Sequence, residues 1–161
     1  MIALTTERLV CTQLVDGDWR FFLALQQHPQ VMRYVADKRS ESEIRAAFDR
    51  QNSALGITGY IHRDHDCAEV GFLFAPESQG KGYGTESLRA VCDYAFGSGG
   101  IRRLTATVTA GNIASRRTLE KLGFRLEGEL RESYFLAGQW HNDWLFGLLS
   151  HEYDNSPSSG Q

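Results

Sequence analysis

The stretch Gln79-Gly-Lys-Gly-Tyr-Gly84 stands directly before a helical pattern that runs to Phe96. Glycine at three alternate positions removes Cβ atoms from this loop and lets its backbone approach a ligand closely. The free N–H groups at a helix N-terminus favour an anion, so we expect a phosphate or pyrophosphate at residues 79–85. The spacing fits neither the Walker pattern nor the dinucleotide fingerprint, which place their glycines differently. A tight connection without a ligand is the alternative for the loop taken alone.

Periodic patterns on both sides of the loop predict alternating strands and helices. Leu104, Ala106 and Val108 alternate with polar residues, as in a strand with one buried face. The expected strands are 9–14, 55–61, 67–75, 103–109, 124–130 and 140–149, and helices are expected at 19–26, from 40, from the loop to 96, and at 113–122. We therefore expect one α/β domain with a mixed sheet over residues 1–153, followed by a polar, frayed tail at 154–161.

Length and charge restrict the class of function. The 161 residues suit a single domain, and a formal charge of −3 argues against binding nucleic acid, which needs a concentrated positive face. Three cysteines without Cys-x-x-Cys spacing predict neither a metal site nor a disulfide framework. No stretch approaches the ~18 apolar residues of a membrane span. We expect a soluble, cytoplasmic protein without a metal, a membrane or a nucleic-acid partner.

Two motifs carry a resemblance to a known family. Gln79-x-x-Gly82-x-Gly84 resembles the pyrophosphate loop of the GNAT superfamily of N-acetyltransferases, and Asn112-Ile-Ala-Ser115 with Glu120-Lys-Leu-Gly-Phe124 is similar to a later segment of that family. The opening residues 6–9 and the closing residues 138–143 resemble its RimJ/RimL-like branch, which acetylates ribosomal-protein N-termini. The resemblance covers residues 4–149. It implies a mainly antiparallel sheet, flanked by helices and splayed in the middle.

The resemblance also implies acetyl-CoA as cosubstrate and a place for each of its parts. The strand before the loop separates from its neighbour, and pantetheine inserts there like an additional strand. Asn112 is then expected to contact the cofactor arm, although it has the form of a plain helix N-cap as well. Pantetheine is expected on the backbone of Phe72, Leu73 and Phe74, and the pyrophosphate on Gln79, Gly80, Lys81, Gly82, Tyr83, Gly84 and Thr85.

Acyl transfer from a thioester to an amine needs a neutral amine and benefits from a proton donor for the departing thiolate. The resemblance places Ser115 as the general acid and Glu69 as the general base. A capping serine and a solvated strand glutamate are the structural alternatives for these two residues. His141 and Asp143 flank the expected acceptor side, where packing of the substrate loop is the favoured interpretation over catalysis.

Two departures from the family concern the acceptor side. The segment between the second helix and Pro76 has room for two strands where the family usually has three, and Thr12 stands where relatives of this branch usually carry Arg. The favoured acceptor is a protein or peptide N-terminal α-amine. A small amine such as a polyamine, amino sugar or antibiotic, a non-catalytic acetyl-CoA sensor and an unrelated nucleotide-binding module remain as alternatives. A homodimer or a higher homo-oligomer is left open.

Overall fold

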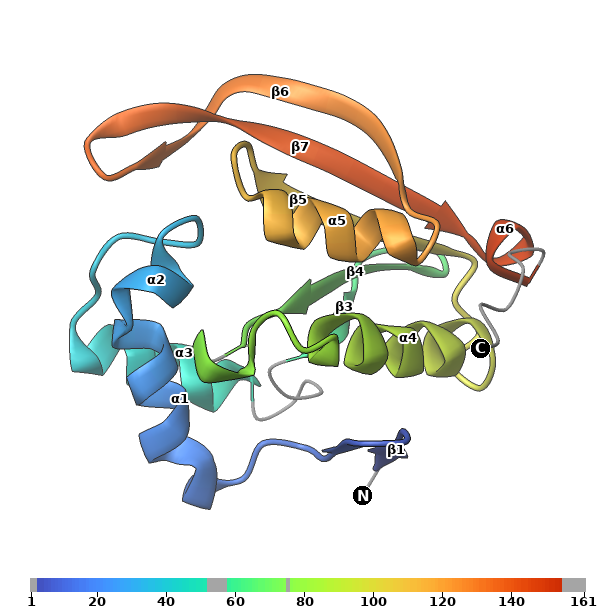
Figure 1. Ribbon diagram of the computed structural model, residues 1–161, viewed down its shortest axis with the longest axis horizontal. Helices are drawn as coiled ribbons and strands as arrows, with labels where there is room; N and C mark the ends of the chain where they lie inside the picture. The colour runs from blue at the N-terminus through green and yellow to red at the C-terminus, as the bar shows by residue number, and fades with distance from the viewer. Residues whose placement is uncertain (1–2, 52–57, 75, 155–161) are drawn as a thin grey trace.

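The structure, a computed structural model, describes residues 3–51, 58–74 and 76–154 (Figure 1). The strands are β1 (Leu4–Thr5), β2 (Val10–Cys11), β3 (Thr58–His62), β4 (Cys67–Phe72), β5 (Arg103–Thr109), β6 (Arg125–Leu136) and β7 (Gln139–Leu149). The helices are α1 (Trp19–Gln27), α2 (Pro29–Met32), α3 (Glu41–Gln51), α4 (Tyr83–Phe96), α5 (Ile113–Lys121) and α6 (Ser150–Asp154).

The main sheet has five strands in the order β3-β4-β5-β7-β6. Only β4 and β5 are parallel, and the other three neighbouring pairs are antiparallel. β1 and β2 pair with each other in a separate two-stranded sheet. The expectation of an α/β domain with a mixed, mainly antiparallel sheet is confirmed.

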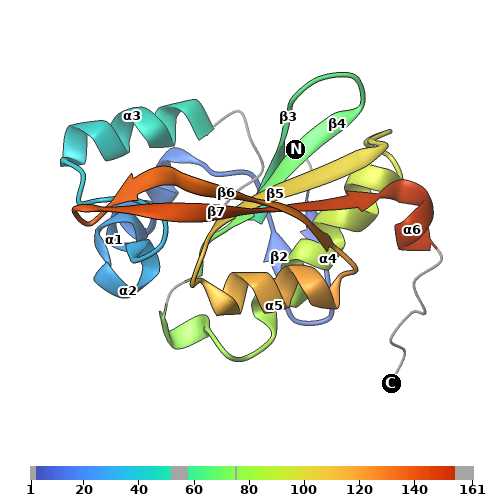
Figure 2. The ribbon, with the colours of Figure 1, turned by 90° about the horizontal axis from the view of Figure 1, so that it is seen from above.

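Alternation along the strands decides which face of the sheet each side chain occupies. Ala68 and Val70 of β4, together with Leu104, Ala106 and Val108 of β5, are buried in one cluster with the apolar sides of α4 and α5. Both helices lie on this face of the sheet, and α3 lies on the other side of the sheet plane (Figure 2). The odd-numbered residues of β4 and β5 therefore point away from α4 and α5.

The first three helices gather at one end of the sheet, beside the tip of the β6–β7 hairpin (Figures 1 and 2). Phe22 of α1 and Phe48 of α3 form the centre of their packing, with ring centroids 5.2 Å apart. Two long-range hydrogen bonds join the segment between α2 and α3 to the hairpin. The Tyr134 hydroxyl donates to the Val35 carbonyl, and the Ala137 N–H donates to Asp37 Oδ1 at 2.7 Å.

Several local signals are confirmed by the structure. Ser40 and Glu43 form a reciprocal capping box at the start of α3, with Ser40 N–H donating to Glu43 Oε2 at 2.8 Å. Strand 103–109 has the predicted bounds, and the helix expected at 113–122 is present one residue shorter. The turn at Ala137–Gly138 is a two-residue hairpin connection in which both φ angles are positive.

Other expectations need correction. The strand expected at 9–14 is only Val10–Cys11, and the one expected at 67–75 ends at Phe72. α1 ends before Pro29 as predicted, but Pro29 itself begins the short helix α2. Asp154, expected in the tail, ends helix α6. Residues 55–57 of a predicted strand and the tail at 155–161 lie outside the described residues.

None of the described helices combines the length and the apolar composition that a bilayer-crossing segment needs.

Candidate active site

The main sheet opens between its two parallel strands. The ladder between β4 and β5 ends at the pair Glu69–Thr105, whereas β4 continues to Phe72 and β5 to Thr109. Beyond that pair the two strands no longer exchange hydrogen bonds, so backbone groups line both sides of the opening. An extended ligand that carries amide groups fits such a place because it can pair like a strand. The predicted mid-sheet splay is confirmed.

Phe72, Leu73 and Phe74 form one side of this opening, at the end of β4. Leu73 packs against the apolar cluster of α1 and α2, which fixes the strand end in place. The Phe74 carbonyl accepts a hydrogen bond from Gln79 Nε2 at 3.1 Å, so the start of the glycine loop is tied back to the strand. The three residues lie where the predicted pantetheine contacts need them, and those contacts stay a prediction.

Residues 79–85 connect a 3-10 turn at Pro76–Ser78 to the first turn of α4. Gly80 and Gly82 have φ angles of +73° and +80°, a backbone region that L side chains adopt only with strain. Gly82 is the N-cap of α4, and the N–H groups of the helix's first turn have no partner within the helix. This arrangement suits a pyrophosphate, whose oxygens accept N–H bonds and whose charge the helix dipole favours.

Arg8 contacts the same loop, and the sequence patterns did not predict this contact. Its Nη1 donates to the Lys81 carbonyl at 2.9 Å, and its Nε donates to Glu86 Oε2 at 2.7 Å. The guanidinium carbon lies 4.7 Å from the centre of the Tyr83 ring. Arg8 thus holds the outer side of the glycine loop against α4. The only signal in the sequence was the branch resemblance of residues 6–9, which carries no contact information.

Asn112 and Ser115 lie together at the turn from β5 into α5. Asn112 is the N-cap of α5, and its Oδ1 accepts a hydrogen bond from the Ser115 N–H at 3.3 Å. Ser115 is in the first turn of α5 and is half-buried. The structure therefore confirms Asn112 as the N-cap of α5, and its contact with the cofactor arm stays a prediction. The role of Ser115 as general acid stays a prediction.

Glu69 lies at the closed end of the opening, on the last residue pair between β4 and β5. Arg63, the first residue of the β3–β4 connection, donates to Glu69 Oε2 through its Nε at 2.9 Å. The Nη2 of Arg63 contacts the same oxygen. Within the described residues, no protein donor contacts Glu69 Oε1. One oxygen of this carboxylate can therefore accept a proton, directly or through a water.

Glu69 and Ser115 occupy opposite sides of the sheet. Ala68 and Val70 face α4 and α5, so Glu69 between them points the other way, whereas Ser115 belongs to α5. Four residues of β5 separate Thr105, the partner of Glu69, from the end of that strand, a rise of roughly 13 Å. The two residues are not brought into contact. They flank the opening from two sides, which suits two substrates that meet inside it.

The β6–β7 hairpin contributes the polar residues expected near the acceptor. Asp143 Oδ2 accepts from the Ser133 hydroxyl at 2.8 Å, and His141 Nε2 lies 3.2 Å from the Leu136 carbonyl. Both side chains hold the irregular hairpin together, which agrees with a packing role. Tyr34 adds an aromatic ring at this end. A Cβ on Gly111, whose φ is +98°, would lie 3.3 Å from Tyr34 Cε1.

The described residues contain no group of three His, Cys, Asp or Glu side chains that is arranged to hold a metal ion.

Similarity to known proteins agrees with this geometry. A family model for the acetyltransferase (GNAT) domain matches residues 8–125, which is most of the chain. The chain is 33% identical over 156 residues to "Putative ribosomal N-acetyltransferase YdaF" of Bacillus subtilis, covering 92% of this chain and 85% of the relative. It is 29% identical over 154 residues to the spermidine N(1)-acetyltransferase of Escherichia coli, covering 84% of this chain and 83% of the relative.

The fold has close counterparts among solved structures. An acetyltransferase of the GNAT family from Bacillus anthracis superimposes with a TM-score of 0.83 at 22% sequence identity, covering 94% of this chain and 100% of that one. The open sheet, the glycine loop and the match to the family model lead to one conclusion. The chain belongs to the GNAT family and is an acetyl-CoA-dependent N-acetyltransferase.

Proposed function

We propose that the protein acetylates the α-amine at the N-terminus of a protein or peptide, by direct attack of the amine on bound acetyl-CoA in a ternary complex. One observation supports a ternary complex, in which coenzyme and acceptor are bound at the same time. The opening between β4 and β5 is flanked by the glycine loop and α5 on one face and by Glu69 on the other. Coenzyme and acceptor can therefore enter from different sides and be present together.

The choice of an α-amine rests on proton arithmetic. An α-amino group has a pKa near 7.7–8.0, so about a quarter of it is neutral at pH 7.4, whereas a lysine near 10.4 is neutral only in about one molecule in a thousand. Among the described residues, Glu69 is the candidate base that borders the opening, and its Oε2 accepts a hydrogen bond from Arg63. A single carboxylate base can supply the neutral form of an amine more readily when part of that amine is already neutral. The similarity to YdaF supports the same acceptor class.

Each part of the site has its own role in the proposed reaction. Acetyl-CoA supplies the acetyl thioester when it is bound. The first turn of α4 holds its pyrophosphate, and the end of β4 orients its arm through backbone hydrogen bonds. Glu69 takes the proton of the attacking amine through a water. Ser115 donates a hydrogen bond or a proton to the sulfur that leaves, and the N-cap Asn112 positions that serine by fixing its N–H.

A polyamine is the second candidate, because the chain is similar to a spermidine acetyltransferase over 84% of its length. Polyamine recognition needs carboxylates that are not used elsewhere. Near the hairpin, Asp37 and Asp143 each accept a hydrogen bond from the protein, and Glu129 accepts one from Asn142. The carboxylates at this end thus serve in part to hold the hairpin, which favours the peptide.

The test compares acceptors at equal concentration with thiol release as the readout. We expect a Ser- or Ala-initiated peptide to react faster than its N-blocked, lysine-containing twin and faster than spermidine. Equal or faster reaction of the blocked peptide rejects the α-amine, and fastest reaction of spermidine favours the polyamine. In Glu69→Gln, turnover is expected to fall about 10²–10⁴-fold, because the base that accepts the amine proton is removed. Glu41→Gln, on the exposed side of α3, is the matched control.

A further inference from the structure

Gly71 lies on β4, in the part of the strand that borders the opening. It is two residues beyond Glu69, the last residue of β4 that pairs with β5, and it is exposed. Because side chains alternate along a strand, position 71 belongs to the same face as Glu69, the face that points away from α4 and α5. Two residues of a strand span about 6.6 Å. A side chain at position 71 would therefore stand next to the place where the acceptor amine has to meet Glu69.

The residue opposite Gly71 on the neighbouring strand is also a glycine. Gly71 pairs with Gly59 of β3, and the next pair on this face joins Glu69 to Ile61. Residues directly opposite each other in an antiparallel pair point to the same face, with their Cβ atoms about 4.5–5.5 Å apart. Two glycines in one pair thus leave the backbone bare across two strands. Ile61, which is 53% exposed, stands beside this bare backbone and adds an apolar surface.

The backbone gives no steric reason for glycine at position 71. Gly71 does not have a positive φ, and a Cβ built on it would have none of the described atoms within 4 Å. The ladder between β3 and β4 has no register shift over its described pairs, so Gly71 does not mark a bulge either. Glycine inside a strand weakens the strand, because it loses more backbone entropy on folding and has no side chain to pack. The remaining reason for a strand glycine is that another molecule approaches the backbone closely.

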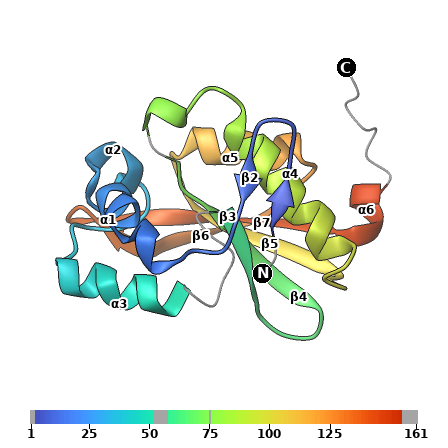
Figure 3. The same ribbon diagram turned by 90° about the horizontal axis from the view of Figure 1, so that it is seen from below.

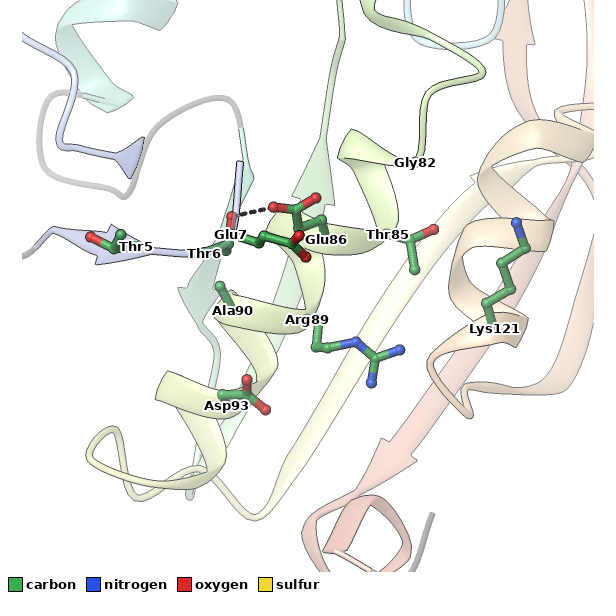
Figure 4. A pocket seen from close by; sticks show the side chains of 10 residues that line it. All are labelled: Thr5, Thr6, Glu7, Gly82, Thr85, Glu86, Arg89, Ala90, Asp93 and Lys121. Carbon is green, nitrogen blue, oxygen red and sulfur yellow. Dashed lines mark hydrogen bonds between the residues drawn. The ribbon is translucent and has the colours of Figure 1, made fainter. Parts of the chain in front are cut away.

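A groove along α4 lies on the other side of the sheet. It has a volume of ≈540 Å³ and runs between the N-terminal arm and the end of α5 (Figure 4). Glu86, Arg89 and Ala90 of α4 line it. The apolar cluster between α4 and the sheet separates this groove from Glu69. An acceptor that brings its amine to Glu69 therefore lies on the face of Gly59 and Gly71.

We propose that Gly71 is a specificity-determining residue for the acceptor. The first residue of the acceptor peptide lies on the bare backbone of Gly59 and Gly71, with its amine directed at Glu69. Because no Cβ occupies this surface, first residues of different size can be placed there. The proposal rests on the proposed acetylation of an α-amine, and it adds the surface that receives the residue carrying that amine.

The test measures steady-state kinetics of Gly71→Ala and Gly71→Val with peptides that begin with Gly, Ser or Leu. The added carbon atoms should lower kcat/KM about five- to hundredfold, the range expected for overfilling a close contact. The loss should be larger for Val than for Ala, and larger for the Leu peptide than for the Gly peptide. The dissociation constant of CoA, measured by calorimetry, should stay unchanged, because both substitutions keep the backbone N–H and C=O of position 71. The Tm of the free protein should stay equal or rise, since both residues suit a strand better than glycine does.

Gly128→Val is the matched control. Gly128 is also a strand residue at which an added Cβ has nothing within 4 Å, but it lies on β6, three strands away from β4 in the sheet. This variant should leave kcat/KM unchanged for every peptide.

Four results overturn the role of Gly71. They are an unchanged kcat/KM in Gly71→Val, equal losses for the Gly and Leu peptides, a loss of CoA affinity as large as the loss of kcat/KM, and a Tm of Gly71→Ala below that of the wild type. If the wild type acetylates spermidine but none of the peptides, the proposed function fails. The same variants are then assayed with spermidine, where a lower kcat/KM in Gly71→Val supports Gly71 as an acceptor contact and an unchanged value overturns it.

Discussion

At the scale of single residues, the turn between β5 and α5 combines a structural and a chemical demand. Asn112 Oδ1 is used by the helix cap, so the amide NH₂ is the part of this side chain that remains for a ligand. Gly111 has a positive φ and lies under the ring of Tyr34, which leaves little room for a Cβ. The backbone conformation of the turn is therefore fixed on both sides of Asn112. The hydrogen bond from the Ser115 N–H to Asn112 fixes the position of Ser115 as well.

Replacing Ser115 with alanine separates catalysis from capping. The cap uses the Ser115 N–H, which alanine keeps, so α5 should form normally and the KM for acetyl-CoA should stay within about threefold. If the hydroxyl serves the leaving sulfur, kcat should fall about 10²–10⁴-fold. Steady-state kinetics with Ser98→Ala, an exposed serine just after α4, provide the control. A loss of turnover below about threefold would show that Ser115 is structural only.

At the scale of elements, the N-terminal arm is attached to α4 by one carboxylate. Glu86 accepts from the Thr6 hydroxyl, from the Arg8 backbone N–H and from the Arg8 guanidinium. The hydrogen bond from Thr6 is the largest cause, followed by that from the Arg8 N–H, of a pKa of Glu86 below its usual value. Because Arg8 also holds the Lys81 carbonyl, the arm, the glycine loop and the start of α4 form one connected unit.

This attachment predicts a dependence of stability on pH. A carboxyl whose pKa is lower in the folded state stabilises the fold above its unfolded pKa, and the contribution is lost as pH falls through the folded pKa. Wild type should therefore lose more thermal stability than Glu86→Gln when the pH is lowered from about 5 to about 3. Melting curves measure this difference, with Glu120→Gln on α5 as the control. Parallel losses in wild type and Glu86→Gln would contradict the attachment.

The elements that the sequence predicted well are those with local signals. The loop and α4, β5 and α5 each have periodic apolar residues and a recognisable start or end, such as Asn112 before α5. β1 is only two residues long and depends on pairing with β2 across a turn, so no periodicity revealed it, and β2 is present as only two residues of the strand expected at 9–14. α2 and α6 are four and five residues long, below the length at which an apolar stripe is visible.

At the scale of the whole molecule, the site was predictable only in part, because only its locally encoded segments leave a signal in the sequence. The glycine loop and the Asn112–Ser115 segment are continuous in sequence, and they lie where expected. Arg8 meets α4 across 78 residues, and the opening depends on where the pairing of β4 with β5, far apart in the chain, ends. Such contacts follow from topology, and no spacing in the chain encodes them.

The whole fold has an opening that the bound coenzyme should bridge. β4 with the glycine loop lies on one side, and β5 with the start of α5 lies on the other. Leu73, just after β4, packs against the apolar cluster of α1 and α2, and these two helices lie next to each other at one end of the sheet (Figure 3). Among the described residues, β4 and β5 do not pair with each other in the opening, and their backbone groups can pair with an extended ligand that enters it. Binding should therefore be coupled to the stability of the entire domain, because the unfolded chain has no such opening.

We expect acetyl-CoA at 100 times its dissociation constant to stabilise the protein by about 2.7 kcal/mol, which corresponds to a rise in Tm of roughly 5–11 °C for a chain of this size. ATP and NAD at the same concentration should give little shift, since neither carries the pantetheine arm that we expect in the opening. Gly82→Asp, which adds a like charge beside the pyrophosphate at a position with a φ of +80°, should lower the Tm of the free protein by a few degrees and abolish the shift. Gly17→Asp adds the same charge where a Cβ has nothing within 4 Å, and it should keep the shift in full. An equal rise with ATP, or an undiminished rise in Gly82→Asp, would contradict the placement of the coenzyme pyrophosphate on the backbone amides of the glycine loop.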